Sequence, residues 1–343
     1  MKKITKIDSI CFNHKQTVFQ AMEAINNKSI PYLIIVNSKN QLLGTVTDGD
    51  IRRHILKGNS LDQTIDIAMN RKPVFSFEKQ KKIHQKKLLS IESIKKFLPI
   101  VNDEKIIKYI LLHEKEEGNN AVLIMAGGFG KRLGNKTKNI PKPLLKVGKK
   151  AVLDIILKKI YRINFKNIFI STHYLHDKID EHIKSKHKNK NIILINEKNP
   201  MGTAGCISLI REPFKNLLVI NGDVISNIDI DALMSFHYET KNDITLSVAK
   251  YTYKIPFGLI ELDKFNRLKN IKEKPLLDYN VVSGIYCLKK SVCNQVSNEY
   301  LDMTTLISNS VSLNKKIGVF PIYEYWQDIG NPNDLIKANT EYG

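Results

Sequence analysis

Ala126-Gly127-Gly128-Phe129-Gly130-Lys131-Arg132-Leu133 is the stretch that decides the fold of this chain. The apolar run 121–125 ahead of it has the length of a buried strand, and residues 151–160 behind it carry apolar side chains at helical spacing. Glycine lets a backbone approach an anion closely, and basic side chains neutralise its charge. The spacing is neither that of a dinucleotide-binding turn nor that of a P-loop. The glycines and basic residues together predict a phosphate-binding turn in an α/β protein, and an ordinary tight turn is the alternative.

Followed by Pro141-Lys142-Pro143, this stretch resembles the signature of the sugar-1-phosphate nucleotidyltransferases, a strand, then A-G-G-x-G-x-R-L, then P-K-P-L-L. Two later segments strengthen the resemblance. Asn221-Gly222-Asp223 and Trp326-Gln327-Asp328-Ile329-Gly330 match the two motifs that carry the metal-binding aspartates of that family, in the same order. The resemblance covers about residues 121–335.

The resemblance implies a role for each matching residue. Asp223 and Asp328 are expected to hold Mg²⁺, an ion that takes oxygen ligands. Together with Arg132 and Lys142, which are expected to bind the triphosphate, they form the catalytic set. Nucleotide contacts are expected from Ala126, Gly127, Gly128, Gly130, Lys131, Gly202, Thr203 and Gly222, and sugar-phosphate contacts from Gly258, Glu273, Lys274 and Ser283.

The implied reaction is the attack of a sugar-1-phosphate oxygen on the α-phosphorus of a nucleoside triphosphate, with release of pyrophosphate. The segment Gly44-Thr45-Val46-Thr47-Asp48-Gly49-Asp50-Ile51 in the first third of the chain resembles a CBS-domain motif. Members of the nucleotidyltransferase family that are fused to CBS domains are usually associated with guanylyl transfer. We therefore expect GTP as the donor and glucosamine-1-phosphate or mannose-1-phosphate as the acceptor, in bacterial surface-glycan synthesis. Uridylyl, thymidylyl and cytidylyl transfer stay open, and so does a catalytically inactive, nucleotide-sensing protein of the same fold.

Strands and helices alternate in the part of the chain that carries these motifs. The runs 168–171, 192–195 and 217–220 are apolar and of strand length. Alternation of this kind predicts a mainly parallel, Rossmann-like α/β sheet covered on both faces, with ligands at the carboxyl ends of its strands. We expect a GT-A-like nucleotidyltransferase domain over residues 118–343, joined to the first third of the chain by a polar linker at 114–120.

The first third of the chain repeats one pattern. An amphipathic helix at 15–27 precedes predicted strands at 31–37 and 41–47, and strands at 97–102 and 106–112 repeat the pair. The region resembles a tandem pair of CBS domains, a Bateman α/β module, with domains at 1–60 and 61–117.

The specific CBS element is Gly44-Thr45-Val46-Thr47-Asp48-Gly49-Asp50-Ile51, which matches that family's G-x-V-[ST]-x-x-D. The resemblance implies a regulatory site for an adenine nucleotide at Thr47 and Asp50. Alternatively, an aspartate here only caps the following helix, and the pair of domains serves to assemble a homo-oligomer. The second copy lacks the Thr-x-x-Asp end of the motif.

Composition limits the remaining possibilities. The net charge of +20 comes from lysines spread along the chain, so we expect no nucleic-acid partner; a basic, nucleic-acid-binding CBS regulator is the competing hypothesis. No apolar run reaches the roughly 20 residues of a membrane span, so we expect no membrane partner. Four scattered cysteines fit a reducing cytoplasm. We expect His173, His176 and His182 at surface or helix-end positions rather than in a metal site, because no acidic or cysteine complement is evident.

Overall fold

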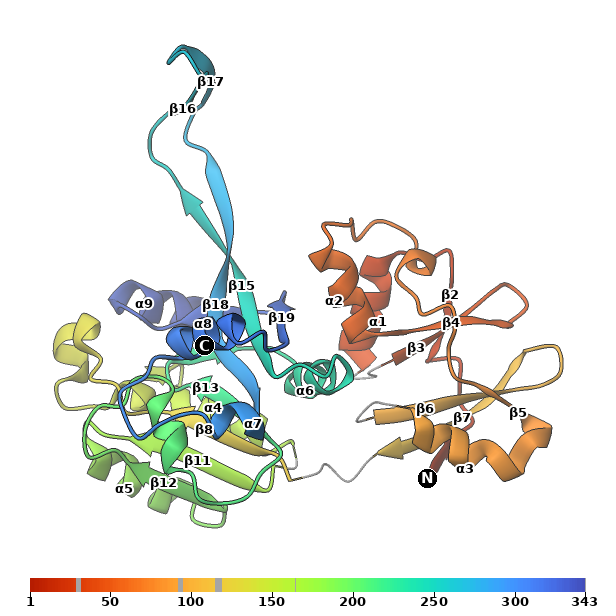
Figure 1. Cartoon of the computed structure of the whole chain (residues 1–343), viewed down its shortest axis with the longest axis horizontal. Helices are drawn as coiled ribbons and strands as arrows, with labels where there is room; N and C mark the ends of the chain where they lie inside the picture. The colour runs from red at the N-terminus through yellow and green to blue at the C-terminus, as the bar shows by residue number, and fades with distance from the viewer. Residues whose placement is uncertain (29–31, 92–94, 115–118, 164, 343) are drawn as a thin grey trace.

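The computed structural model describes residues 1–28, 32–91, 95–114, 119–163 and 165–342. Residues 115–118, the middle of the predicted linker, lie outside the described residues. Figure 1 shows two parts, the first third of the chain on one side and the remainder on the other. No described helix has both the length and the apolar character that crossing a membrane would require.

The first third forms two small sheets. One has the order β2-β3-β4 and the other the order β1-β7-β6-β5. Since β1 pairs with β7, the first strand of the chain joins the sheet of the second copy. The four strands predicted from the repeated pattern are confirmed within two residues at each end. The elements are β1 (Lys2–Ile4), β2 (Cys11–Asn13), α1 (Val18–Lys28), β3 (Tyr32–Val36), β4 (Leu42–Thr47), α2 (Asp48–Leu56), η1 (Ile65–Ile67), β5 (Ser76–Phe77), η2 (Glu78–Gln80), α3 (Lys81–Ser90), β6 (Lys95–Val101) and β7 (Ile107–Glu114).

A seven-stranded sheet of order β12-β11-β8-β13-β18-β15-β19 organises the rest of the chain. Every strand except β18 runs in the same direction, because β18 is antiparallel to both of its neighbours and all other pairs are parallel. The predicted mainly parallel sheet is thus confirmed. Its strands are β8 (Ala121–Met125), β11 (Asn167–Thr172), β12 (Ile192–Asn196), β13 (Asn216–Asn221), β15 (Ile244–Lys254), β18 (Leu276–Lys289) and β19 (Ile317–Ile322).

Two hydrophobic cores cover the two faces of this sheet. Alternate residues of β8 enter different cores, with Val122 and Ile124 in one and Leu123 in the other. A strand that is buried on both faces reads as a continuous apolar run, which is why these strands were recognisable in the sequence. The elements that accompany the sheet are η3 (Lys131–Thr137), η4 (Lys142–Leu144), β9 (Lys146–Val147), β10 (Lys150–Ala151), α4 (Val152–Ile160), α5 (His176–Lys186), η5 (Gly205–Leu209), β14 (Val224–Ser226), α6 (Ile230–Glu239), α7 (Lys290–Cys293), α8 (Met303–Ser312), β20 (Trp326–Asp328) and α9 (Pro332–Glu341).

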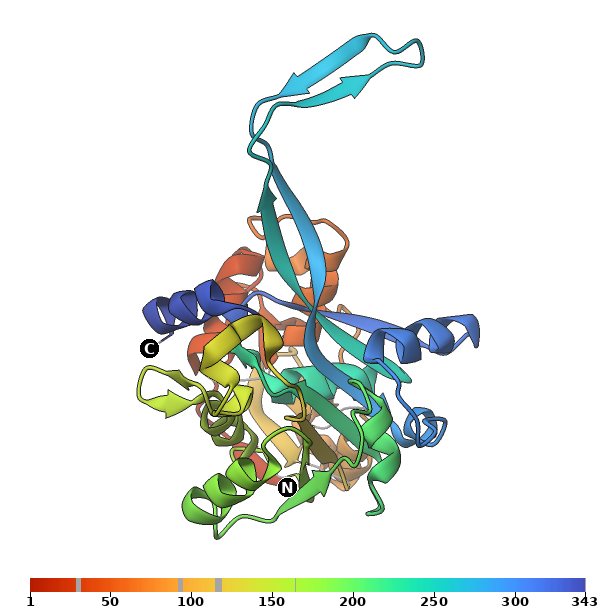
Figure 2. The same cartoon turned by 90° about the vertical axis from the view of Figure 1, so that its left-hand side faces the viewer.

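Strands β15 and β18 extend beyond the sheet as a two-stranded arm. The arm ends in a second antiparallel pair, β16 (Leu259–Leu262) with β17 (Leu268–Lys272), and both views show it projecting from the domain (Figures 1 and 2). An isolated two-stranded ribbon is marginally stable, and a long run of exposed apolar residues marks a contact surface. Large apolar side chains that are 41% to 73% exposed follow the arm, namely Tyr251, Tyr253, Phe257, Ile260, Leu262, Phe265, Leu268, Ile271, Leu276, Tyr279 and Val282.

Arg52 of α2 joins the two parts of the chain. Its Nε donates to Asp48 Oδ2 at 2.5 Å and its Nη2 to Glu324 Oε1 at 2.7 Å, while Nη1 donates to the carbonyl of Pro321. The guanidinium also lies 4.1 Å from the ring centre of Phe320. Only 4% of the Arg52 side chain is exposed. Glu324 lies shortly before β20, so this buried cation contacts the segment that leads to Asp328.

Buried His237 of α6 should make the stability of the fold depend on pH. The ring is buried, with Nδ1 2.8 Å from Thr245 Oγ1, and burial, followed by the charge of Lys289, lowers the pKa of His237 to about 4. Because the unfolded chain takes up a proton near pH 6.5 and the folded ring does not, stability is lost as the pH falls from 6.5 towards 4. Between pH 7 and pH 5 the loss should be about 2 kcal/mol.

Urea unfolding at pH 7 and pH 5 measures this difference. We expect His237→Gln to show a smaller fall in the free energy of unfolding between the two pH values than the parent chain. An equal fall in both would rule out His237 as the source.

Candidate functional site

The two predicted acidic residues come together just beyond the carboxyl end of β13. Asp223 follows β13, and β14 beyond it pairs with β20 so that Val224 lies opposite Asp328. The amide of Ile329 donates to the carbonyl of Asp223 at 3.0 Å. A two-stranded sheet therefore holds two carboxylates side by side that are far apart in the sequence.

Two cations converge on this pair. Lys142, in η4, forms a hydrogen-bonded ion pair with Asp223 Oδ2 and is mostly buried. The guanidinium of Arg132 lies beside Gly330, where an added Cβ would stand 3.5 Å from Nη1. Both positive charges act on the Asp328 carboxyl and favour its ionised form. All four predicted catalytic residues thus share one electrostatic environment.

The burial and the hydrogen bonding of Asp328 suit a carboxylate that binds a cation. Burial and then the negative charge of Asp223 raise its pKa to about 6. Its Oδ1 is buried and finds no hydrogen-bond partner among the described residues, and the same holds for Oδ1 of Asn221. Both residues line a cleft of about 300 Å³ together with Trp326 and Gly284. Orphaned oxygens beside paired carboxylates fit a hard divalent ion such as Mg²⁺.

Two glycines fix the turns that meet at this edge. Gly130 has φ of +65°, and a Cβ there would lie 2.8 Å from the side chain of Thr137, whose hydroxyl donates to the Gly130 carbonyl at 2.9 Å. The amide of Gly222 donates to the carbonyl of Met125 at 2.8 Å, and a Cβ on Gly222 would stand only 2.5 Å from that oxygen. Gly130 therefore closes the turn after β8 on Thr137, and Gly222 lets the turn after β13 approach the last residue of β8, at positions where a Cβ would clash.

The predicted nucleotide residues divide into two groups. Gly127, Gly128 and Lys131 follow β8 beside Arg132, and Ala126 donates its amide to the carbonyl of Ser171 at 2.7 Å, which keeps the turn at the sheet edge. Gly202 and Thr203 lie instead against the start of α8. The Thr203 hydroxyl accepts the amide of Met303 at 2.8 Å and bonds to Asp302, so this side chain has structural partners.

Sequence reasoning missed Glu197. Its carboxylate is buried, accepts from the hydroxyl of Ser171 and, at 3.0 Å, from the amide of Met201. A Cβ on Gly127 would lie 3.1 Å from Glu197 Oε1, so this acid forms one wall beside the glycine turn. Its position two residues after the predicted strand at 192–195 was the available signal, since ligands collect at strand ends.

Most of the predicted sugar-phosphate residues lie on the arm. Gly258, Glu273 and Lys274 stand between the two strand pairs of the arm, and in both views this part of the arm rises away from the sheet (Figures 1 and 2). The structure does not bring them together with Asp223 and Asp328. Ser283 lies at the base of the arm, where its buried hydroxyl bonds to Ser247 Oγ at 2.6 Å and its carbonyl accepts from Trp326 Nε1 at 2.9 Å. Ser283 lines the cleft, but both its hydroxyl and its carbonyl already have partners within the chain.

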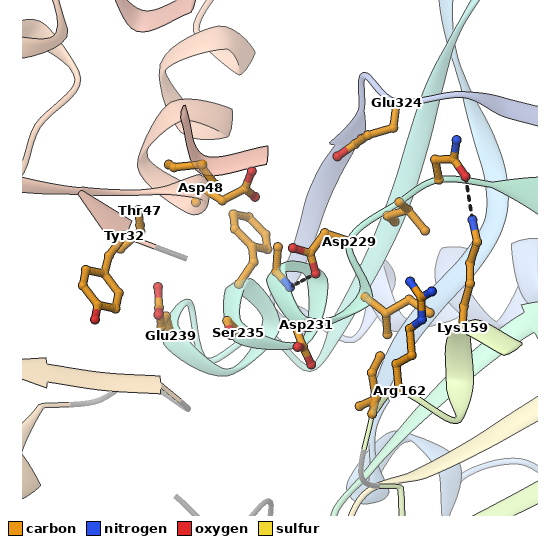
Figure 3. A pocket seen from close by; sticks show the side chains of 18 of the residues that line it. Tyr32, Thr47, Asp48, Lys159, Arg162, Asp229, Asp231, Ser235, Glu239 and Glu324 are labelled. Atoms are coloured by element: carbon orange, nitrogen blue, oxygen red, sulfur yellow. Dashed lines mark hydrogen bonds between the residues drawn. The ribbon is translucent and has the colours of Figure 1, made fainter. Parts of the chain in front are cut away.

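A larger pocket of about 710 Å³ lies between the first third of the chain and α6. Figure 3 shows Tyr32, Thr47 and Asp48 on one side and Asp229, Asp231, Ser235 and Glu239 of the α6 region on the other. Thr47 lines it, but the side chains of Thr47 and Asp50 form a capping box at the start of α2, and Asp50 also pairs with Arg53 at 2.7 Å. The helix-capping role considered for the aspartates is therefore present at Asp50.

Comparison with known proteins assigns the two parts of the chain to two different families. Residues 121–343 match the family model described as nucleotidyl transferase, and residues 1–57 match that of the CBS domain. The chain is 27% identical over 242 residues to the catalytic subunit beta of mannose-1-phosphate guanylyltransferase from Drosophila melanogaster, covering 66% of this chain and 65% of that protein. The first curated relatives are thus matched over less than two thirds of their length.

A shorter relative is matched almost completely. It is the D-glycero-α-D-manno-heptose 1-phosphate guanylyltransferase of Aneurinibacillus thermoaerophilus, which is 27% identical over 64% of this chain and 96% of its own length. Among solved structures, HddC from Yersinia pseudotuberculosis in complex with GMP-PN superimposes with a TM-score of 0.51 at 23% identity, over 65% of this chain and 99% of that one. This structural likeness supports the fold alone.

Proposed function

The chain belongs to the nucleotidyl transferase family and carries an N-terminal CBS domain, and from this premise we propose that it joins GTP to a sugar-1-phosphate, forming a GDP-sugar and pyrophosphate. The observation that carries the proposal is the convergence of Arg132, Lys142, Asp223 and Asp328 at one sheet edge. An inactive, nucleotide-sensing protein would have no need of this complete set of charges.

The residues act by binding and positioning. Arg132 neutralises the β- and γ-phosphates and so stabilises the leaving pyrophosphate, and Lys142 holds the phosphate at the α position. Asp223 and Asp328 would hold Mg²⁺, which when bound offsets the charge of the two phosphates that must approach each other. The sugar-phosphate oxygen then forms a bond to the α-phosphorus as the bond to the β-phosphate bridging oxygen breaks. Such transfers depend on alignment and charge neutralisation, and no covalent enzyme intermediate is required.

The guanine base and the sugar are proposed from the relatives. The two curated relatives described above are named as guanylyltransferases for mannose-1-phosphate and for a manno-heptose 1-phosphate. We propose GTP as the donor, and mannose-1-phosphate or glucosamine-1-phosphate as the acceptor, for surface-glycan synthesis. A pyrophosphate-release screen of GTP, ATP, UTP, CTP and dTTP against both acceptors and glucose-1-phosphate tests this choice. GTP should give the highest kcat/KM, and preference for another triphosphate would overturn the guanylyl assignment while leaving the reaction class intact.

We propose that the arm closes over the cleft of its own chain. Pro256, Gly258 and Pro275 interrupt the ribbon where β15–β18 gives way to β16–β17, and closing there would carry Glu273 and Lys274 towards the sugar phosphate. Closure would bury the exposed apolar side chains of the arm against the domain, and this burial favours the closed state by about 25 cal/mol per Å² of apolar surface. Hinges at such positions are typical of segments that shut over a substrate.

Lys274→Ala should reduce kcat/KM for the sugar phosphate about 10²-fold, since it removes one cationic contact to phosphate. The matched control is Lys264→Ala in the turn at the tip of the arm, which should have little effect. Mixing the Lys274→Ala chain with an Asp223→Asn chain distinguishes closure within one chain from exchange between two. We expect the mixture to show only the sum of the two residual activities, and recovery of much higher activity would contradict closure within the chain.

We also propose that the CBS module binds an adenine nucleotide or assembles the chain into a homo-oligomer in the cytoplasm, with neither nucleic acid nor membrane as a partner. Thr47 borders the pocket of Figure 3, but Asp48, Asp229, Asp231, Glu239 and Glu324 make much of that pocket acidic. A polyphosphate would therefore have to lie towards Lys159 and Arg162. Titration with AMP and ATP, followed by the melting temperature, tests nucleotide binding directly. The four free cysteines are in keeping with a reducing compartment.

A further inference from the structure

Three side chains with nitrogen and oxygen donors meet between α4 and the end of α5. Asp154 lies in the first turn of α4, His182 in the last part of α5, and His187 directly after that helix. Asp154 Oδ1 lies 2.7 Å from His182 Nε2 and 3.0 Å from His187 Nε2. The expectation that His182 lacks an acidic complement is wrong, because the carboxylate comes from a helix 28 positions earlier.

The cluster has the donors and the spacing of a transition-metal site. The three potential ligand atoms all lie within 4.8 Å of one another, and the side chains are only 12% to 16% exposed. In a tetrahedral zinc site, with bonds of about 2.0 to 2.1 Å, neighbouring ligand atoms stand about 3.3 Å apart. The contacts at 2.7 and 3.0 Å need to widen by only a few tenths of an ångström to admit the ion. A set of two imidazoles and a carboxylate also binds zinc in preference to magnesium or calcium, which take mainly oxygen ligands.

Tyr161 supplies the support that metal-binding histidines usually have. Its hydroxyl lies 2.9 Å from His187 Nδ1. The phenol oxygen can accept a hydrogen bond from Nδ1–H of His187. In that tautomer the proton stays on Nδ1, so Nε2 is unprotonated and directed at Asp154. Such outer contacts fix the tautomer of a ligand and raise its affinity for the metal.

The positive charges of the surrounding lysines weaken cation binding at this cluster only to a limited degree. Lys186 Nζ stands 3.6 Å from Asp154 Oδ2, but the Lys186 side chain is 57% exposed and can turn into solvent. Lys184 is paired with Asp180 at 2.6 Å, and Lys190 lies 4.6 Å from the ring centre of Tyr161. Lys186 is thus the direct competitor for the carboxylate, and this competition can be tested.

We propose that Asp154, His182 and His187 bind one zinc ion, with water as the fourth ligand, and that the ion ties α4 to the end of α5. The site shares no residue with the cleft of Asp223 and Asp328, so it stands independently of the proposed reaction. The expected consequence of zinc binding is a more stable fold, because the ion would hold α4 against the end of α5.

Zinc titration of the chelator-treated full chain, in excess Mg²⁺ to occupy oxygen-only sites, tests the proposal. We expect one Zn²⁺ per chain and a higher melting temperature, both reversed by EDTA. His182→Asn and His187→Asn should lose the ion, whereas His176→Asn, in the same helix but bonded to Thr172, should keep it. The melting temperature of each metal-free variant shows whether it folds, and the visible absorption of bound Co²⁺ reports four-coordination.

Two further variants separate a metal site from a simple hydrogen-bonded cluster. Lys186→Gln should bind zinc more tightly because the competing charge is gone, and Tyr161→Phe should bind it about 10 to 100-fold more weakly. If the parent chain retains no zinc, or if binding persists unchanged in His182→Asn, the proposal is overturned and the cluster only clamps two helices.

Discussion

Asp223→Asn should lower kcat at least about 10³-fold, which corresponds to about 4 kcal/mol of transition-state stabilisation. The substitution keeps the size of the side chain but removes the charge that faces Lys142 and adjoins Asp328. An amide is a poor ligand for Mg²⁺, and Lys142 loses the partner that orients it. Steady-state pyrophosphate release at saturating GTP, acceptor and Mg²⁺ measures the effect.

Folding has to be separated from chemistry in this comparison. Asp177→Asn is the matched control, since Asp177 is exposed in the first turn of α5 and should leave turnover within about twofold of the parent. The melting temperature of Asp223→Asn should stay close to that of the parent chain. Turnover near the parent level in Asp223→Asn would contradict the metal-binding role.

Arg52→Met should destabilise the folded chain by about 3 to 5 kcal/mol. The substitution removes the cation that both Asp48 and Glu324 contact, and it leaves their carboxylates facing each other in a largely buried contact. Burial raises the pKa of Asp48 even with Arg52 present, so loss of the guanidinium favours protonation or separation of the two parts. The free energy of unfolding in urea, followed by Trp326 fluorescence and by circular dichroism, measures the loss.

Arg53→Met is the control at the neighbouring position. Arg53 also pairs with an aspartate, but its side chain is 40% exposed, so we expect a change below about 1 kcal/mol. Equal effects of the two substitutions would show that Arg52 is no special link between the CBS domain and the catalytic part. Coinciding transitions in both probes are needed before a single free energy is assigned.

The strand–turn–strand elements were predictable because their signals are local. The run 121–125 is apolar throughout, as a strand buried on both faces must be, and Gly130 and Gly222 stand where the backbone has to turn or approach closely. The placing of Asp223 beside Asp328 followed from a family pattern rather than from periodicity. The structure supplies the reason, which is the pairing of β14 with β20.

Other features depend on contacts that no local pattern encodes. Whether β15 and β18 stay in the sheet or leave it depends on contacts with distant segments, so the arm could not be predicted. Ser283 matched a motif, yet its hydroxyl is engaged by Ser247 from a neighbouring strand. Asp154 and His187 looked unremarkable in the sequence because the residues that meet them lie on another helix.

Diffraction from crystals grown with Mn²⁺ and a non-hydrolysable GTP analogue tests the central claim most directly, which is that two distant aspartates and two cations surround one metal-bound triphosphate. We expect an anomalous manganese peak within coordination distance of both Asp223 and Asp328, with Arg132 and Lys142 contacting the phosphates. A manganese ion held by only one of the aspartates, or a triphosphate bound away from Arg132, would contradict the account.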